Sequence, residues 1–359
     1  MAKITASAPG KILLLGGYSV LERPNIALVL VVDAYVHAEV KLRKDDKIVI
    51  SIPQFKKKIK TDLTKIDKEN DKRANFVLNA VKFTLKYLEN RKIDVTGFNL
   101  TTKSDKQFSV ESGKSGLGSS AAVTVATVAA ISEAFSLNTK SNIDRVHSLA
   151  QYTHAISQGK IGSGFDIAAA CFGSIKYSRY RPELLTSNEP TIVLGTDLDY
   201  SANAAKMPLT IKLLAANFPK QSMSTTFSVS KVMEFKKSNP QKYAEIMSEL
   251  DAVNRNALAT LESGDLDAFR RYFEQGRLLT KKLGKLSEVG IETEKHTKLI
   301  EESKKNGAFV CKLPGAGGGD SIVALCKSEE DKKQLAEFWK SKGLKLLDIN
   351  LVNQGVIVR

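Results

Sequence analysis

The segment KSGLGSSAAV, residues 114–123, decides the interpretation of this sequence because it begins a helix with very little side chain. Glycine weakens helix interiors and serine prefers helix caps, yet an alanine- and valine-rich helical pattern follows over 120–135. A glycine loop that leads into a helix N-terminus exposes backbone N–H groups and attracts anions through the helix dipole. We expect its serines either to cap the helix or to donate to phosphate and ligate Mg²⁺. The loop is not a Walker A motif, since the lysine precedes the glycines.

A second glycine-rich stretch, PGAGGGD at 314–320, lies between two expected strands. A hairpin turn explains two glycines, whereas four glycines in one strand connection indicate that the backbone approaches a ligand. A merely flexible hairpin is the alternative.

Two further stretches place a charged side chain beside glycines. In SAPGKILLLGGY (7–18), Lys11 stands at the mouth of an apolar strand, where its ammonium group either neutralises a transferring phosphoryl group or reaches the surface. In QGKIGSGFD (158–166), Asp166 precedes a helix and is either its N-cap or a catalytic group. Taken alone, this aspartate is best interpreted as a cap.

The composition, with 42% hydrophobic and 26% charged residues, is that of a soluble globular protein. The formal net charge of +15 favours anionic partners such as nucleotides, phosphorylated metabolites or nucleic acid. The lysine clusters at 56–58 and 281–282 lack interleaved aromatic residues, so nucleic-acid binding is not expected.

The cysteines and the apolar runs bear on where the protein works. The three cysteines form no close pair, which indicates neither a disulfide framework nor a cysteine metal site. The apolar run 26–32 is too short to cross a bilayer, and the N-terminus lacks the pattern of a signal peptide. We therefore expect a cytoplasmic protein without a membrane partner.

Hydrophobic periodicity predicts an α+β protein in two parts. The first part has expected strands at 12–15, 27–32 and 36–42 and expected helices at 75–90, 120–135 and 142–158. The second part has expected strands at 209–216, 308–313 and 322–326 and expected helices at 227–237, 243–262, 266–286, 293–305 and 329–341, with Asp265 as an N-cap and a final strand after them. The polar stretch 186–208 is the expected crossing, which gives domains 1–195 and 196–359 with a cleft between them.

Taken in order, the four stretches resemble the motifs of the GHMP kinase superfamily. The resemblance covers residues 5 to about 325 through Pro-Gly-Lys (9–11), Gly-Leu-Gly-Ser-Ser-Ala-Ala (116–122), Gly-x-Asp (164–166) and Gly-Ala-Gly-Gly-Gly-Asp (315–320). It implies an N-terminal domain similar to ribosomal protein S5 domain 2 and a ferredoxin-like C-terminal domain. Gly16-Gly17-Tyr18 stands where galactokinases and mevalonate kinases read Gly-Glu-His, and this string looks like the phosphomevalonate kinase branch.

The resemblance implies ATP-dependent phosphorylation of 5-phosphomevalonate to 5-diphosphomevalonate in the mevalonate pathway of isoprenoid biosynthesis. The sequence leaves open whether the protein is a monomer or a homodimer. Lys11 and Asp166 would be catalytic, and Ser120 would ligate Mg²⁺. Asp166 matches the acidic residue that acts as the base in mevalonate kinases; because a phosphate acceptor is already mostly deprotonated, we expect Asp166 here to orient Lys11, and the choice between these two roles stays open. The residues implied to bind the ATP phosphates are Lys114, Gly116, Leu117, Gly118, Ser119, Ser120 and Ala121. The residues implied to bind the acceptor substrate are Gly17, Tyr18, Ser163, Gly164, Ser224, Thr225, Gly317, Gly318, Gly319 and Asp320.

One departure from the family pattern concerns the metal. Mevalonate kinases bring a metal-binding glutamate one or two helical turns upstream of Gly-x-Asp, where this chain has His154 and Gln158 and no carboxylate. A second protein ligand to Mg²⁺ therefore stays open, with water as a candidate. His147 and His154 lie seven residues apart on one helix, a spacing that favours packing over metal binding.

Three alternatives remain at the level of the sequence. A GHMP kinase acting on a hydroxyl group, as in mevalonate or homoserine, shares the same motifs. A non-catalytic ATP-binding sensor on the same fold is disfavoured by the joint presence of Lys11, Ser120 and Asp166. A nucleic-acid-binding module is the weakest alternative.

Overall fold

The computed structural model describes residues 3–110, 113–159, 162–185, 197–208, 210–219, 225–319 and 321–359. Its strands are β1 (Lys3–Leu15), β2 (Ile26–Leu42), β3 (Lys47–Ile52), β4 (Lys57–Asp62), β5 (Phe98–Ser104), β6 (Ser109–Val110), β7 (Gly113–Lys114), β8 (Ile175–Ser178), β9 (Ser201–Ala204), β10 (Lys212–Asn217), β11 (Val310–Lys312), β12 (Ser321–Cys326), β13 (Lys345–Leu347), β14 (Leu351–Val352) and β15 (Ile357–Val358). Its α-helices are α1 (Asn75–Asn90), α2 (Ser119–Ala134), α3 (Ile143–Ser157), α4 (Phe165–Phe172), α6 (Thr225–Ser238), α7 (Pro240–Ser263), α8 (Leu266–Leu286), α9 (Glu294–Lys305) and α10 (Glu329–Ser341).

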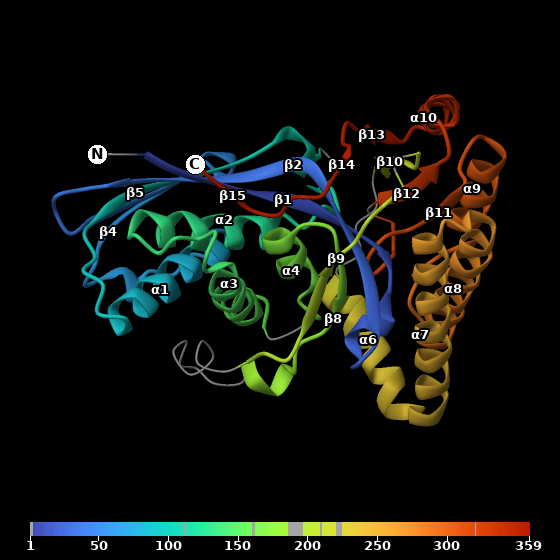
Figure 1. Ribbon diagram of the computed structural model, residues 1–359, viewed down its shortest axis with the longest axis horizontal. Coiled ribbons are helices and arrows are strands. Elements are labelled where there is room, and N and C mark those ends of the chain that lie inside the picture. The colour runs from blue at the N-terminus through green and yellow to red at the C-terminus, as the bar shows by residue number, and fades with distance from the viewer. Residues whose placement is uncertain are drawn as a thin grey trace.

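A large sheet, covered on one face by helices, dominates the first part of the chain (Figure 1). Its path runs β15-β1-β2-β5-β3-β4, with β14 and β8 paired to β2 and β9 paired to β8. Helix α2 lies between β1 and β2 on one side and α1, α3 and α4 on the other. Because both sides are covered, α2 is apolar around most of its circumference, and its alanines allow neighbouring elements to pack closely.

The expected strands 27–32 and 36–42 are wrong as two separate elements, since β2 runs unbroken through both. The pairing of β1 with β2 shifts register between Pro9 and Gly10, where Pro9 faces Tyr35 and Gly10 faces Val32. A β-bulge in β2 therefore accommodates residues 33 and 34, which lie between the two strands expected from the sequence. Proline has no N–H to donate, which favours an irregularity at this point.

The second part of the chain contains a four-stranded sheet in the order β11-β12-β10-β13. Helix α10 packs on β10, β12 and β13, while α8 and α9 contact β11. Helices α7 and α8 form a long antiparallel pair beside this sheet (Figure 1), and α7 also contacts β2 of the large sheet. None of the described helices combines the length and apolar content needed to cross a membrane.

Most helix predictions are confirmed within one to three residues at each end. The ends are correct for 75–90, 266–286 and 329–341, and Asp265 caps α8 by accepting a hydrogen bond from the Ala268 amide at 2.9 Å. The expected strand 209–216 is shifted to β10, and the expected strand 308–313 is shortened to β11.

The expected domain boundary between residues 195 and 196 lies in a segment, 186–196, that is outside the described residues. The boundary stays a prediction. The large sheet includes strands from both sides of this boundary, because β9, β14 and β15 come from beyond residue 196 and still pair within that sheet. The C-terminal strands thus return to the first part of the chain after the second sheet is complete.

Candidate active site

The first glycine loop (residues 115–118) joins β7 to α2 through two left-handed glycines. Gly116 and Gly118 have φ angles of 76° and 79°, a region in which other residues are strained. A Cβ atom on Gly118 would lie 2.8 Å from Lys11 Cε, and one on Gly116 would lie 2.7 Å from Ser321 Oγ. The loop therefore has small residues because a lysine from β1 and a serine from β12 occupy the space around it.

Backbone amides at the start of α2 are available to a ligand. Gly118 is the N-cap residue and no side chain caps the helix, so the interpretation of Ser119 or Ser120 as a cap is wrong. The N–H groups of residues 119–121 lack intrahelical partners, as in any first helical turn. Within the described part of the chain, the N–H groups of residues 116–121 donate to no acceptor. These free donors and the helix dipole together form an anion-binding cradle.

Lys11 lies directly against this loop. Its backbone N–H donates to the Leu117 carbonyl at 2.9 Å, and its ammonium group donates to the Gly116 carbonyl at 3.0 Å. The ammonium group also lies 5.6 Å from the centre of the Phe165 ring. Burial lowers the pKa of Lys11, and the nearby charge of Asp166 opposes this shift. The lysine therefore joins the first glycine loop to the Gly-x-Asp motif.

Asp166 lies in the first turn of α4, and Gly164, not Asp166, is the N-cap residue. The interpretation of Asp166 as a helix cap is therefore wrong. One of its carboxylate oxygens accepts a hydrogen bond from the next amide, Ile167, at 3.1 Å. Gly164 has a φ of 78°, and a Cβ atom there would overlap the Gln151 amide. The tight packing of Gly164 on α3 therefore fixes where α4 begins and hence where Asp166 lies.

His154 of α3 occupies the region where the family pattern has a carboxylate. Its Nε2 lies 3.1 Å from Ser120 Oγ, and its ring lies 5.2 Å from that of Phe76. Burial lowers the pKa of His154; the charge of Asp166 opposes this effect and that of Lys11 adds to it. The other histidine of this helix, His147, instead packs between the rings of Phe172 and Tyr200.

The second glycine loop (residues 314–319) is held by hydrogen bonds to the protein itself. The Tyr18 hydroxyl donates to the Ala316 carbonyl at 2.8 Å, and the Gly318 amide donates to the Ile291 carbonyl at 3.0 Å. A Cβ atom on Gly317 would lie 2.4 Å from the same Ile291 carbonyl. The glycines of this loop were expected to let the backbone approach a ligand. At Gly317 the backbone instead approaches the protein's own chain, at the connection between α8 and α9.

The residues implied to bind the acceptor are brought together only in part. Tyr18 is buried, and its pKa is raised by burial and lowered in part by a hydrogen bond with Ser228, which places α6 beside the second glycine loop. Thr225 is exposed at the start of α6, and Ser163 is buried with its carbonyl accepting from the Tyr177 hydroxyl at 2.7 Å. Ser224, Asp320 and the Lys114 side chain lie outside the described residues.

Arg179 is a cation at this site that the sequence motifs did not include. Its two terminal nitrogens donate to the carbonyls of Leu21 at 2.6 Å and Gly162 at 2.8 Å. Among the described residues no carboxylate lies within 4.0 Å of it. The arginine follows β8, thirteen positions after Asp166, and only its place directly after a strand could have marked it in the sequence.

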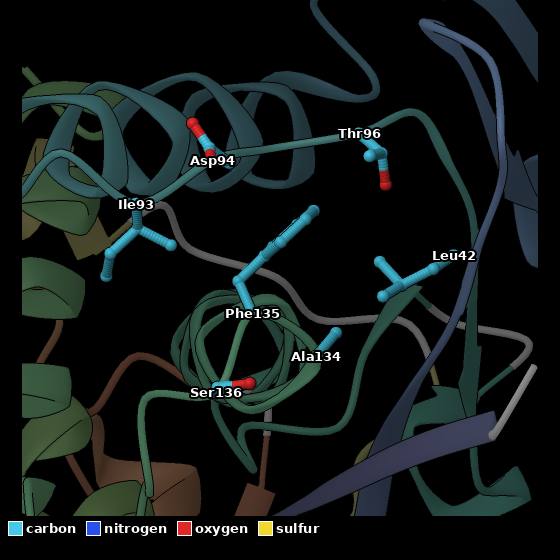
Figure 2. A pocket seen from close by; sticks show the side chains of 7 residues that line it. All are labelled: Leu42, Ile93, Asp94, Thr96, Ala134, Phe135 and Ser136. Carbon is cyan, nitrogen blue, oxygen red and sulfur yellow. The ribbon is translucent and has the colours of Figure 1, made fainter.

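An apolar hollow of about 410 Å³ lies away from these groups (Figure 2). It is lined by Leu42, Ile93, Asp94, Thr96, Ala134, Phe135 and Ser136. Ala134 is the last residue of α2, so the hollow and the first glycine loop lie at opposite ends of a helix about 24 Å long. The hollow contains none of the predicted site residues.

Comparison with known proteins agrees with this arrangement. The family model "GHMP kinases N terminal domain" matches residues 75–174, and "GHMP kinases C terminal" matches residues 257–345. The chain belongs to the GHMP kinases and has their two-domain fold.

The similar proteins are more specific. The chain is 31% identical to a phosphomevalonate kinase of Saccharolobus solfataricus, over 96% of each chain. It is 28% identical to a phosphomevalonate kinase of Gibberella zeae, over 94% of this chain and 91% of that one. The solved structure of Streptococcus pneumoniae phosphomevalonate kinase in complex with phosphomevalonate and AMPPNP has a TM-score of 0.81 at 21% identity, covering 98% of this chain and 100% of that chain.

Proposed function

We propose that this protein transfers the γ-phosphoryl group of ATP to 5-phosphomevalonate, giving 5-diphosphomevalonate and ADP in the mevalonate pathway. The observation that carries the proposal is the Lys11 ammonium group, held 3.0 Å from the Gly116 carbonyl beside the N-terminus of α2 and within the electrostatic influence of Asp166. A cation and free backbone amides at the N-terminus of α2, with a carboxylate in the first turn of α4, are the components that phosphoryl transfer needs. The names of the similar proteins support the choice of acceptor.

The acceptor phosphate needs charge neutralisation more than a general base. The second pKa of a phosphate monoester is near ~6, so its attacking oxygen is already deprotonated at neutral pH. Two unit charges 4 Å apart repel by about 4 kcal/mol at an effective dielectric constant near 20. Lys11 lowers this barrier by lying between donor and acceptor, and Asp166 orients Lys11 and takes no proton.

The oxygen donors at this site fit Mg²⁺. Ser120 offers a hydroxyl in the first turn of α2 and Asp166 a carboxylate in the first turn of α4, and the charge of Asp166 acts on His154, whose ring contacts Ser120. Mg²⁺ prefers such oxygen ligands completed by phosphate oxygens and water. When bound, the ion would neutralise charge on the ATP phosphates. Among the described residues no cluster of three acidic, histidine or cysteine side chains could hold a metal alone, so the nucleotide itself would supply ligands.

The acceptor is expected on the side of Arg179 and the second glycine loop. Arg179 donates to two carbonyl oxygens, lies 5.7 Å from the centre of the Tyr180 ring, and adjoins Gly162 in the segment that leads to Asp166. The charge of Glu22 acts on it from a greater distance. We infer that Arg179 attracts an anionic group of the acceptor. In this arrangement residues 1–195 bind the ATP phosphates and residues 196–359 close the site. Three free, buried cysteines accord with the expected reducing, cytoplasmic surroundings.

A coupled ADP-release assay tests the proposal. Mg-ATP is offered with mevalonate, 5-phosphomevalonate, homoserine or galactose separately. Turnover with 5-phosphomevalonate alone is expected. Turnover with an unphosphorylated acceptor would replace the proposed substrate and make Asp166 a general base. No turnover with any acceptor, together with measurable ATP binding, would favour the sensor alternative.

A further inference from the structure

His154 contacts the hydroxyl of Ser120, in the first turn of α2. Its Nε2 lies 3.1 Å from Ser120 Oγ. His154 is 4% exposed, and the Phe76 ring lies 5.2 Å from its own ring, so the imidazole has little freedom to turn away. The Ser120 hydroxyl is therefore held by a rigid neighbour from a different helix.

We propose that His154 is a positioning residue that orients Ser120 for the divalent cation of the bound metal–nucleotide complex. When Nε2 accepts the hydroxyl proton of Ser120, both lone pairs of Oγ are left for a cation. Partners that orient metal ligands in this way commonly determine cation affinity. The proposal rests on the proposed nucleotide site and is independent of the identity of the acceptor.

This assignment explains why a carboxylate is not required at this place. A carboxylate upstream of Gly-x-Asp would bind the cation directly and add negative charge. His154 instead acts through its contact with the Ser120 hydroxyl, at 3.1 Å, and does not bind the cation itself. The cation then depends on Ser120, on Asp166 and on the nucleotide phosphates.

The test measures cation-dependent nucleotide binding without any acceptor. AMPPNP is titrated into the protein by calorimetry in the presence of Mn²⁺ and, separately, in EDTA. We expect H154F to weaken binding of Mn²⁺-AMPPNP by about 10- to 100-fold, with metal-free AMPPNP binding nearly unchanged. H154Q, whose amide can replace Nε2 in the hydrogen bond to Ser120, should recover most of the affinity.

Two further variants separate positioning from general damage. H147F changes the other buried histidine of α3, which contacts Phe172 and Tyr200, and should leave cation-dependent binding within about twofold of the native value. S120A removes the hydroxyl, so H154F should add no further loss in that background.

The results decide the proposal in either direction. Equal weakening with and without Mn²⁺, no weakening, or additive effects of H154F and S120A would overturn it. If H154F does not fold, H154N takes its place, because its shorter amide falls short of Ser120 while keeping a polar side chain; normal Mn²⁺-AMPPNP affinity in H154N would also overturn it. An inactive protein that still shows the expected binding pattern would contradict the proposed acceptor and leave this inference standing.

Discussion

The two glycine loops look alike in sequence and differ in what their backbones do. In the first, the N–H groups of residues 116–121 have no partner within the described chain, while the surrounding space is filled by Lys11 and Ser321. In the second, Gly317 and Gly318 donate to the carbonyls of Pro314 and Ile291. A glycine-rich loop binds an anion only where its amides are left free, and the same composition elsewhere serves close packing.

Each loop also has a lysine whose ammonium group donates to a backbone carbonyl. Lys11 donates to the Gly116 carbonyl, and Lys312, two residues before the second loop, donates to the Leu14 carbonyl at 3.3 Å. Burial lowers the pKa of both lysines, with Asp166 opposing the shift at Lys11 and Glu292 opposing it at Lys312. The two side chains are alike in environment, and only the first adjoins free amides and the Gly-x-Asp motif.

The largest expected effect comes from replacing each of these lysines, in turn, by methionine. K11M should reduce kcat by about 10³-fold because it removes the cation nearest the transferring group, whereas K312M should leave kcat nearly unchanged. D166N should lose clearly less activity than K11M, since Asp166 orients the lysine. Steady-state kinetics of the three variants provides the measurement. Equal and severe losses in K11M and D166N, with a pH profile that follows one carboxylate, would refute this division of roles.

Gly118 and Gly315 offer the next comparison, because both have positive φ and only one is crowded. G118A should reduce kcat/KM by about 100-fold, since its Cβ would lie 2.8 Å from Lys11 Cε and displace the ammonium group. G315A introduces the same backbone strain with no atom within 4 Å of the added Cβ, so its activity should stay close to native. Similar losses in both variants would mean that backbone strain, and not displacement of Lys11, limits the first loop.

Tyr18, in the short 3-10 helix Tyr18–Leu21 that follows β1, tests whether this segment holds the second glycine loop. Y18F removes the hydroxyl that donates to Ala316, leaving a carbonyl without this partner, and should lower the free energy of unfolding by about 1 kcal/mol. We also expect a higher KM for the acceptor with little change in KM for ATP, because the loop lies on the acceptor side. Chemical denaturation and initial-rate kinetics measure the two effects. An altered KM for ATP alone would place the loop on the nucleotide side.

The smallest expected effect is a dependence of stability on pH at Lys312. Burial lowers the pKa of Lys312 from 10.5 to about 8, so between these values the unfolded chain binds more protons than the folded one. Stability contributed at this position therefore rises with pH across that window, because the cost of burying the charge disappears. The free energy of unfolding of the native protein, relative to K312M, should increase from pH 8 to pH 10. A constant difference would show that Lys312 keeps its ordinary pKa.

The sequence by itself determined the elements that depend on local signals. Helices with a clear apolar stripe and defined ends, such as 75–90, 266–286 and 329–341, were predicted with the correct limits, because periodicity and caps lie within the segment. The order of the glycine motifs was enough to indicate the GHMP kinases and to place Lys11 and Asp166 at one site. In the structure the charge of Asp166 opposes the lowering of the Lys11 pKa by burial; their catalytic roles stay predictions.

Only the tertiary structure decided how distant segments use those elements. The bulge opposite Pro9, the return of β14 and β15 to the large sheet, and the contact between His154 and Ser120 each join residues far apart in the chain. Arg179 has no local motif, and the two glycine loops differ only in what the rest of the fold places against them. Local propensities determine which residues form an element, whereas the positions of side chains and free amides at the site depend on long-range packing that no single segment encodes.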